Sequence, residues 1–335
     1  MVMNPTQVLL LCGGGSAEHE VSLVSANYLE SELTSLPSVS VVRVEITKDE
    51  GWKDSEGQAC RLNLDKTLTV GDKIIAIDYV VPCIHGYPGE TGDIQSLLEL
   101  AGLPYMGCDP SASIVCFNKI TSKLWFDAIG IPNTPYVFLT ENSADSVLKA
   151  EEAFERWGAI FVKAACQGSS VGCFKVSEKE SIKDAIEQAF TFSNQVLVEK
   201  AVRPRELEIA AYHFNGEVVV TNPGEIRCPE DTFYTYDEKY STASHSLTTL
   251  EPDNLTDEQI AKMREYAKRA FVHLKLKDLS RIDFFLTTDG EVLLNEINTF
   301  PGMTPISMFP KLVEHNGHTF SDYLASCIQS GINGG

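Results

Sequence analysis

The sequence predicts an α/β protein with more than one domain, and three observations support this. The chain has 335 residues, which is more than one ordinary hydrophobic core organises. Its first third alternates short apolar runs with helical patterns, as a parallel α/β domain does. The remainder combines amphipathic helices with hairpin signals, which indicates two α+β lobes. We therefore expect an N-terminal domain over 1–110, a central lobe over 111–204 and a C-terminal lobe over 205–335.

The first third predicts strands over 7–12, 41–46 and 74–84, with a helix over 16–33. The first strand ends in Gly13-Gly14-Gly15-Ser16. A glycine turn that opens a helix can aim backbone N–H groups at an anion, although a plain tight turn has the same pattern. It is neither the dinucleotide fingerprint nor the P-loop motif, which argues against a dinucleotide oxidoreductase. His85 follows the last of these strands, where α/β sites form, but a core histidine fits equally well.

The middle of the chain predicts helices over 113–128 and 181–190 and strands over 159–163, 172–176 and 195–200. The first two strands flank Gln167-Gly168-Ser169-Ser170. Glycine lets the backbone approach an anion and serine adds hydroxyl donors, although a polar turn is the simpler alternative. Four lysines are candidate phosphate ligands: Lys119, Lys163, Lys200 and Lys239. Lys163 stands apart because it ends an apolar run.

The last part begins with strands over 207–212 and 218–221, joined at Asn215-Gly216, which is a strong hairpin signal. Thr256 and Gln259 have the spacing of a capping box, and the helix that they open has one apolar face.

A second hairpin, over 281–286 and 291–297, carries the most chemical information. Asp289-Gly290 is a preferred two-residue turn, and that register places Asp283 opposite Glu296 and Arg281 opposite Asn298. These four side chains then share one face of the hairpin. The other face is predicted to be core, and its residues are Ile282, Phe284, Leu286, Leu293 and Ile297.

Opposed carboxylates repel each other unless a cation lies between them. Oxygen ligands on strands suit Mg²⁺, which uses one or two carboxylates together with substrate phosphates. A surface acid patch that Arg281 neutralises is the alternative. The loop after Asn298 could bring backbone N–H groups and Ser307 close to whatever the metal holds.

Composition excludes several classes of function. The net charge of −20 argues against nucleic-acid or anionic-membrane partners, which need a basic surface. The nine cysteines contain no C-x-x-C pair, which favours a reducing compartment over disulfides or a zinc site. Neither a signal peptide nor an apolar run long enough to span a bilayer is present, so the sequence predicts a cytoplasmic protein.

Taken in order, these segments resemble the D-alanine–D-alanine ligases of peptidoglycan synthesis, in the ATP-grasp superfamily, from about Leu10 to Pro310. The matching segments are Gly13-Gly14-Gly15-Ser16-Ala17-Glu18-His19-Glu20-Val21-Ser22, His85-Gly86 with Gly89-Glu90 and Gln95, Asn118-Lys119 through Lys123, Gly168-Ser169-Ser170-Val171-Gly172, Arg205-Glu206-Leu207-Glu208, Pro223-Gly224-Glu225-Ile226, Tyr234 through Tyr240, Arg281-Ile282-Asp283, Asn295-Glu296-Ile297-Asn298-Thr299 and Pro301-Gly302-Met303-Thr304.

The resemblance implies an ATP-grasp fold, in which two lobes clasp ATP, and a role for each matching residue. For the first D-alanine, it implies that Glu18 binds the amino group with His85 close by. The residues implied to hold ATP are Lys119, Lys163, Glu199, Lys200, Glu206, Phe233 and Lys239. Those implied to ligate two Mg²⁺ ions, for which Mn²⁺ could substitute, are Asp283, Glu296 and Asn298. Those implied to stabilise the anionic intermediate are Arg281, Ser169 and the N–H of Gly302. Ser307 would grip the carboxylate of the second D-alanine, and Lys239 and Tyr240 would lie on a loop that closes over the site.

The implied reaction joins two D-alanines through an acyl phosphate, as part of cell-wall and cell-shape maintenance, in a homodimer. Two alternatives remain open: a D-serine or D-lactate second substrate, against which Tyr240 argues, and a non-catalytic ATP-binding protein. The retained Asp283, Glu296, Asn298 and Arg281 argue against the latter. The chain departs from the family at Thr91, Ala164 and Gln167.

Overall fold

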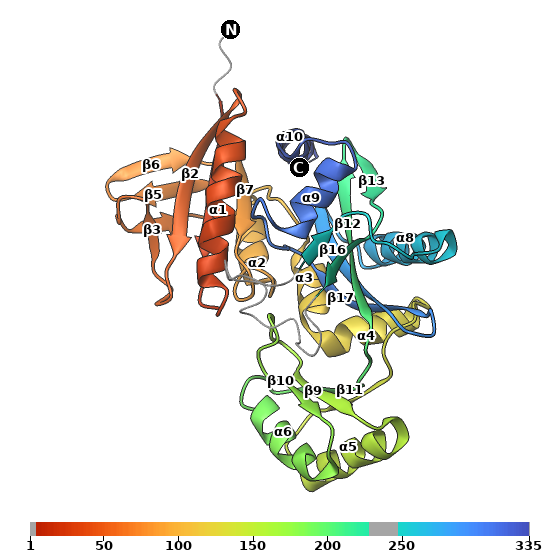
Figure 1. Cartoon of the computed structure of the whole chain (residues 1–335). Coiled ribbons are helices and arrows are strands. Elements are labelled where there is room, and N and C mark those ends of the chain that lie inside the picture. The colour runs from red at the N-terminus through yellow and green to blue at the C-terminus, as the bar shows by residue number, and fades with distance from the viewer. Residues whose placement is uncertain (1–4, 228–246, 335) are drawn as a thin grey trace.

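The computed structural model describes residues 5–227 and 247–334, which form four β-sheets with helices packed on them (Figure 1). The N-terminal part lies at the left of Figure 1, the central part at the bottom, and the C-terminal part at the right. Within the described ranges, no helix combines the length and the apolar character that crossing a membrane requires.

The N-terminal sheet has the strand order β3-β2-β1-β7, with β1 (Thr6–Gly13), β2 (Val39–Ile46), β3 (Trp52–Asp54) and β7 (Tyr79–Cys83). Strand β1 is parallel to both β2 and β7, which confirms the predicted parallel α/β arrangement. Helix α1 (His19–Thr34) covers one face, and α2 (Asp93–Leu100) follows β7.

The single strand predicted over 74–84 is wrong, because the chain changes sheets within it. Strand β6 (Lys73–Ala76) pairs in a separate sheet with β5 (Thr67–Val70), which in turn pairs with β4 (Cys60–Leu62). Ile77 and Asp78 then connect to β7, and the Asp78 carboxylate accepts a hydrogen bond from Gln7 N at 2.7 Å. Apolar composition alone does not show where one strand ends and the next begins.

The central sheet has the order β10-β9-β11-β8, with β8 (Tyr136–Leu139), β9 (Ile160–Ala164), β10 (Cys173–Val176) and β11 (Val196–Lys200). All of its pairings are antiparallel. Helix α5 (Ala144–Trp157) and helix α6 (Ile182–Ala189), which the short 3₁₀ helix η1 (Lys179–Ser181) precedes, pack on this sheet to form one hydrophobic core.

The single helix predicted over 113–128 is also wrong. The chain forms α3 (Pro110–Phe117) and α4 (Lys119–Ala128), with Asn118 between them in an extended conformation. The Asn118 side chain accepts hydrogen bonds from the N–H groups of Ile120 and Thr121, so it caps the start of α4. A capping asparagine can therefore divide an apolar pattern that is otherwise continuous.

The C-terminal sheet has the order β15-β14-β12-β16-β17, with β13 paired to the free stretch of β12. Its strands are β12 (Arg205–Phe214), β13 (Glu217–Val220), β14 (Gly224–Arg227), β15 (Leu247–Thr249), β16 (Leu279–Leu286) and β17 (Val292–Asn298). The Asn215-Gly216 hairpin is confirmed, since Phe214 pairs with Glu217. The capping box of α8 (Asp257–His273) is confirmed as well.

The last two helices are α9 (Met308–His315) and α10 (Phe320–Asn333). They pack against the first strand and the first helix of the N-terminal part. Phe309 and Tyr323 share one hydrophobic core with Val8 and Leu10 of β1. Tyr28 of α1 stacks on Phe320, with 5.4 Å between ring centroids. The N-terminal sheet is therefore packed against the C-terminal part of the molecule.

The β16–β17 hairpin has the predicted pairing around Asp283 and Arg281, but its turn is one residue longer than predicted. Thr287 and Glu291 enclose a three-residue loop over 288–290, in which Gly290 has a φ of +84°. The register then shifts by one residue between Asp283 and Phe284 of β16, opposite Asn295 in β17. This bulge offsets the extra turn residue, so Asp283 pairs with Glu296 and Arg281 with Asn298 as predicted.

The assignment of Leu293 to the core face is wrong as a result. Between the turn and the bulge, Phe284 pairs with Leu294, which is fully buried and belongs to the core beneath the sheet. Leu293 pairs with Phe285 and therefore lies on the same face as Asp283.

Candidate active site

The structure brings two predicted loops together across the N-terminal and central sheets. Ser169 Oγ donates a hydrogen bond of 2.6 Å to Glu18 Oε1, although the two residues are 151 positions apart. Ser169 and Ser170 both have positive φ values, so the loop is held in a conformation that side chains rarely adopt. A Cβ at Gly168 would lie 2.9 Å from Glu18 Oε2, so a side chain there would displace the Glu18 carboxylate.

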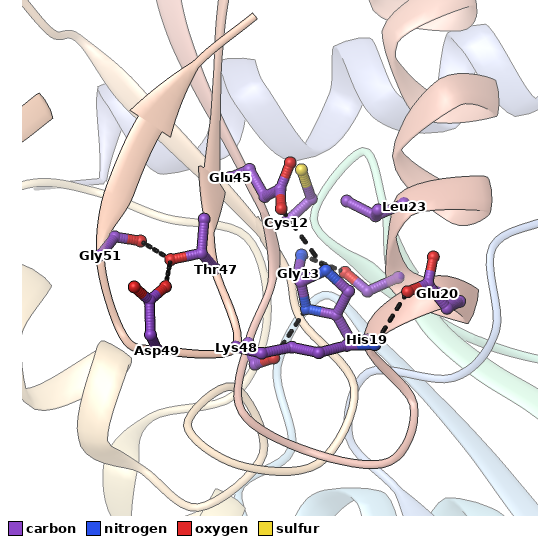
Figure 2. Close-up of polar contacts among 12 residues, drawn as sticks. Cys12, Gly13, His19, Glu20, Leu23, Glu45, Thr47, Lys48, Asp49 and Gly51 are labelled. Atoms are coloured by element: carbon purple, nitrogen blue, oxygen red, sulfur yellow. Dashed lines mark hydrogen bonds and ion pairs between the residues drawn. The ribbon is translucent and has the colours of Figure 1, made fainter. Parts of the chain in front are cut away.

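The glycine turn after β1 is fixed by contacts within the protein (Figure 2). Gly13 N donates to Ser22 Oγ at 2.7 Å and Gly14 N donates to Ile46 O at 2.7 Å. The Nδ1 of His19 carries the proton and donates to Gly14 O at 2.8 Å, because a carbonyl only accepts. Two of the N–H groups in this turn are thus already used, which favours the tight-turn interpretation over an anion site formed by these donors.

His85 links the N-terminal sheet to the loop that carries Gly302. Its Nδ1 donates to Phe300 O at 3.1 Å, so its Nε2 accepts from Ser25 Oγ at 3.0 Å. Ser25 Oγ in turn accepts from Met303 N at 3.2 Å. Both ring nitrogens are engaged, and burial lowers the pKa of His85, so the ring is neutral and holds the segment around Gly302.

Glu90 lies beside this network, where Gly86 N donates to its Oε2 at 2.8 Å. Burial, and then the charge of Glu18, raise the pKa of Glu90 to about 8. A carboxyl in that state is protonated at neutral pH, so Glu90 is neutral in this network.

Three lysines of the predicted phosphate set lie on or beside the central sheet. Lys163 on β9 contacts Glu199 Oε2 at 2.5 Å, and Lys119 Nζ donates to Gln167 O at 2.5 Å. Lys200, at the end of β11, is exposed, and Glu206 lies near the start of β12. Burial alone would lower the pKa of Lys163, but Glu199 and, from the C-terminal sheet, Glu296 raise it.

The acidic face of the C-terminal sheet contains one carboxylate more than the sequence analysis identified. Glu208 on β12 pairs with Asp283 on β16, which pairs with Glu296 on β17, so three acids form a row across three strands. Arg281 binds Asp283 through two hydrogen bonds, of 2.8 and 2.7 Å, and lies 3.3 Å from Glu208 Oε2. The alternation of Glu206 and Glu208 along β12 was the signal that could have placed Glu208 on this face.

This face fits a hard cation that also binds phosphate. Asn298 Nδ2 donates to Asp283 Oδ2 at 3.0 Å, so an amide completes the pair of Asp283 and Glu296. In the described ranges no group of three or more His, Cys, Asp or Glu side chains is placed to hold a metal ion by itself. Two carboxylates and an amide are a set that Mg²⁺ accepts when phosphate oxygens and water supply the remaining ligands.

Gly302 and Ser307 lie next to each other at the start of α9. A Cβ at Gly302 would be 3.0 Å from Ser307 Oγ. Ser307 Oγ accepts a hydrogen bond from Thr304 N at 3.1 Å and contacts Thr304 Oγ1 at 2.8 Å. Three further predicted site residues, Phe233, Lys239 and Tyr240, lie outside the described residues.

Two of the departures from the family have local explanations. Gln167 Nε2 donates to Phe192 O at 3.0 Å, which a carboxylate could not do, so the amide anchors the base of the Ser169 loop. Thr91 Oγ1 donates to the Asp93 carboxylate at the start of α2. Ala164 ends β9 and is buried.

Comparison with known proteins places both parts of the chain in one family. Residues 7–108 match the family model of the D-ala D-ala ligase N-terminus, and residues 125–329 match that of the D-ala D-ala ligase C-terminus. A D-alanine–D-alanine ligase of Vibrio cholerae is 60% identical over 327 residues, covering 97% of this chain and 99% of the relative. One from Tolumonas auensis is 58% identical over 330 residues, covering 98% and 100%.

Solved structures agree with the sequence relatives. The crystal structure of D-alanyl-alanine synthetase A from Vibrio cholerae superposes with a TM-score of 0.95 at 58% identity, covering 99% of this chain and 100% of that one. The VanG D-Ala:D-Ser ligase from Enterococcus faecalis reaches 0.86 at 29% identity, covering 97% and 99%. The fold is the predicted ATP-grasp fold, and the chain belongs to the D-alanine–D-alanine ligase family.

Proposed function

We propose that this chain joins two D-alanines into D-alanyl-D-alanine, with ATP converted to ADP and phosphate, for peptidoglycan precursor synthesis. Its family is ATP-dependent, and its relatives are D-alanine–D-alanine ligases at about 60% identity. The observation that best supports the proposal is the face shared by Arg281, Asp283, Glu296 and Asn298. A protein that only bound ATP would have no use for a guanidinium beside two acids and an amide.

The first D-alanine lies, in this proposal, at the contact between the N-terminal and central parts. Glu18 binds its ammonium group, next to the buried and neutral Glu90. Ser169 fixes the Glu18 carboxylate through their 2.6 Å hydrogen bond. His85 lies close by and holds the Gly302 segment.

ATP lies between the central and C-terminal sheets, where its phosphates meet the lysines. The residues proposed to hold it are Lys119, Lys163, Glu199, Lys200, Glu206, Phe233 and Lys239. The residues proposed to hold Mg²⁺ are Asp283, Glu296 and Asn298. Mg²⁺, when bound, neutralises phosphate charge and aligns the γ-phosphate for transfer.

The chemistry divides into two transfers. The carboxylate of the first D-alanine attacks the γ-phosphate, so an acyl–O–P bond forms and ADP leaves. The amine of the second D-alanine then attacks the acyl carbon, loses a proton and displaces phosphate. Arg281, Ser169 and the Gly302 N–H stabilise the negative charge on the tetrahedral intermediate. Ser307 holds the carboxylate of the second D-alanine, and Lys239 contacts the substrates from the loop that closes over the site.

The organisation of the protein around this reaction is part of the proposal. The division into 1–110, 111–204 and 205–335 places the nucleotide between the last two parts. Tyr240 belongs to the segment that closes over the substrates, which matters because water would hydrolyse an acyl phosphate. A homodimer in the cytoplasm, with neither nucleic acid nor membrane as a partner, completes the proposal.

Phosphate release from ATP and Mg²⁺, with and without D-alanine, tests this function when the products are identified by mass spectrometry. Release that depends on D-alanine and yields the dipeptide is the expected result. A parallel reaction with D-alanine and D-serine together measures the choice of second substrate. If the main product were the mixed dipeptide of D-alanine and D-serine, the chain would instead have the D-Ala:D-Ser ligase activity for which the Enterococcus relative is named. No release with any amino or hydroxy acid would contradict the proposal.

A further inference from the structure

Lys123 is a buried lysine in α4 to which the proposed mechanism gives no part. Its exposed fraction is only 2%, and lysines are almost never buried so completely unless they are paired. Its Nζ lies 3.1 Å from Asn133 Oδ1, 3.1 Å from Thr134 O and 2.6 Å from Glu199 Oε1. The first two contacts are hydrogen bonds that Lys123 donates, and the third is an ion pair with the Glu199 carboxylate.

Glu199 connects this lysine to the nucleotide site. One of its carboxylate oxygens contacts Lys123, and the other contacts Lys163 Nζ at 2.5 Å. The carboxylate is 2% exposed, so water does not compete for it. Although burial alone would raise the pKa of Glu199, Lys123 and Lys163 bring it down to about 2, which keeps the carboxylate ionised.

The cluster of Lys123, Glu199 and Lys163 therefore has two positive charges and one negative charge. The excess positive charge is available at one end only. Lys123 is enclosed by α4 and the segment before β8, whereas the side chain of Lys163 is 16% exposed. Glu296 of the C-terminal sheet also contributes to raising the pKa of Lys163, so the two groups are close enough for their charges to interact.

We infer that Lys123 is a positioning residue for the nucleotide: by holding Glu199 it fixes Lys163 and keeps a net positive charge where the phosphates bind. This inference rests on the proposed function, in which Lys163 binds ATP. Without Lys123, the carboxylate would neutralise Lys163 completely, and Lys163 would be drawn toward Glu199 and away from an anionic ligand.

A purely structural role is the alternative, because Lys123 also ties α4 to Asn133 and Thr134. The two roles differ in what they predict for a folded variant. A structural tie changes the melting temperature but not the affinity for ATP. A positioning role lowers the affinity for ATP, and it does so only while Lys163 is present.

The test is calorimetric titration of the full-length protein with ATP and Mg²⁺ in the absence of D-alanine, for the wild type and Lys123→Met. We expect Kd for ATP to rise roughly tenfold, as typical for loss of a hydrogen bond to a charged group, while KM for D-alanine is unchanged. Lys149→Met is the matched control, since this exposed lysine of the same lobe also donates to a backbone carbonyl, Phe138 O at 2.9 Å. Its Kd should equal that of the wild type.

A double-mutant cycle with Lys163→Met then decides whether Lys123 acts through Lys163. We expect Lys123→Met to have no further effect on Kd in the Lys163→Met background. Additive losses, or an unchanged Kd in the folded single variant, would overturn the inference. If Lys123→Met does not fold, Lys123→Gln removes the charge but keeps an N–H donor, and the same tenfold loss is expected. A wild-type protein that binds no ATP would instead overturn the proposed function itself.

Discussion

The central and C-terminal sheets each carry a cluster of charged side chains, and the two clusters have opposite excess charge. In the central lobe, two lysines share one carboxylate, that of Glu199. In the C-terminal lobe, one arginine faces three carboxylates, those of Glu208, Asp283 and Glu296. Neither cluster neutralises itself, although both are largely buried.

The difference shows how an acidic protein can build a site for an anion. The chain has a net charge of −20, so a phosphate would be repelled without a local excess of positive charge. The lysine cluster provides that excess on one side. The acidic row suits a divalent cation on the other side, and a nucleotide with its metal would satisfy both. Three predictions test whether the clusters are as distinct as this suggests.

Asp283→Asn should have the largest effect. The substitution keeps the size of the side chain but removes a charge from the middle of the acidic row. We expect turnover to fall on the order of a thousandfold, because the metal supplies several kcal/mol to phosphoryl transfer. Binding of ATP alone should change little, since the lysine cluster is untouched. Near-normal turnover would remove Asp283 from the metal site, and an equal loss of ATP binding would end the distinction between the clusters.

Asp278→Asn examines a buried carboxylate whose cationic partner, the half-exposed Lys277, lies 4.0 Å away. Burial raises its pKa to about 6, whereas Glu199 in the lysine cluster has a pKa of about 2. A raised pKa means that the wild type is most stable below the ordinary value of 3.8 and loses stability as pH rises to about 6. The variant should lack this decline, which amounts to roughly 3 kcal/mol.

The loss of stability caused by Asp278 is measured by thermal unfolding of both proteins between pH 4 and pH 7. It appears as a steeper fall of melting temperature with pH in the wild type than in the variant. Asparagine also accepts the hydrogen bond from Gly107 N and tolerates the positive φ of this position. Parallel slopes would show that Asp278 is ionised in the folded protein.

Glu208→Gln should have the smallest effect, because this residue acts on Arg281 and not on the metal. With Glu208 neutral, Arg281 loses one of its carboxylate contacts and competes more strongly for Asp283. We expect the Mg²⁺ concentration for half-maximal turnover to rise about tenfold, as is common when a neighbour of a metal ligand is changed. Turnover at saturating Mg²⁺ should be retained. An unchanged Mg²⁺ requirement would limit the acidic cluster to Asp283 and Glu296.

Much of this site could be predicted because its residues follow short-range rules. Alternation along a strand places Arg281 and Asp283 on one face, and an apolar run that ends in Lys163 identifies a lysine beside a core. Glu208 and Lys123 were not given roles, because their partners are distant in sequence. Only the pairing of β12 with β16, and the packing of α4 near β11, bring them into the clusters.

The helix over 113–128 and the strand over 74–84 were wrong for a related reason. Hydrophobic pattern shows which residues are buried, but it does not show where the backbone changes direction. Asn118 divides the helix by bonding to N–H groups of the following turn, and the strand divides where the chain crosses between sheets. These positions depend on hydrogen bonds that compete with the regular structure.

The bulge at Asn295, opposite the step from Asp283 to Phe284, affects which insertions and deletions the hairpin can tolerate. Deleting one residue from the 288–290 loop would leave Thr287 opposite Glu291 across a two-residue turn, and deleting Asn295 would remove the bulge while Asp283 still pairs with Glu296. Either deletion therefore keeps the acidic side chains on their own face of the sheet. Inserting or deleting one residue within 284–286 or 292–294 would instead shift the pairing and turn an acidic side chain toward the hydrophobic core. Length is thus constrained in the paired stretch between the turn and the bulge, and engineered changes belong in the loop or at the bulge.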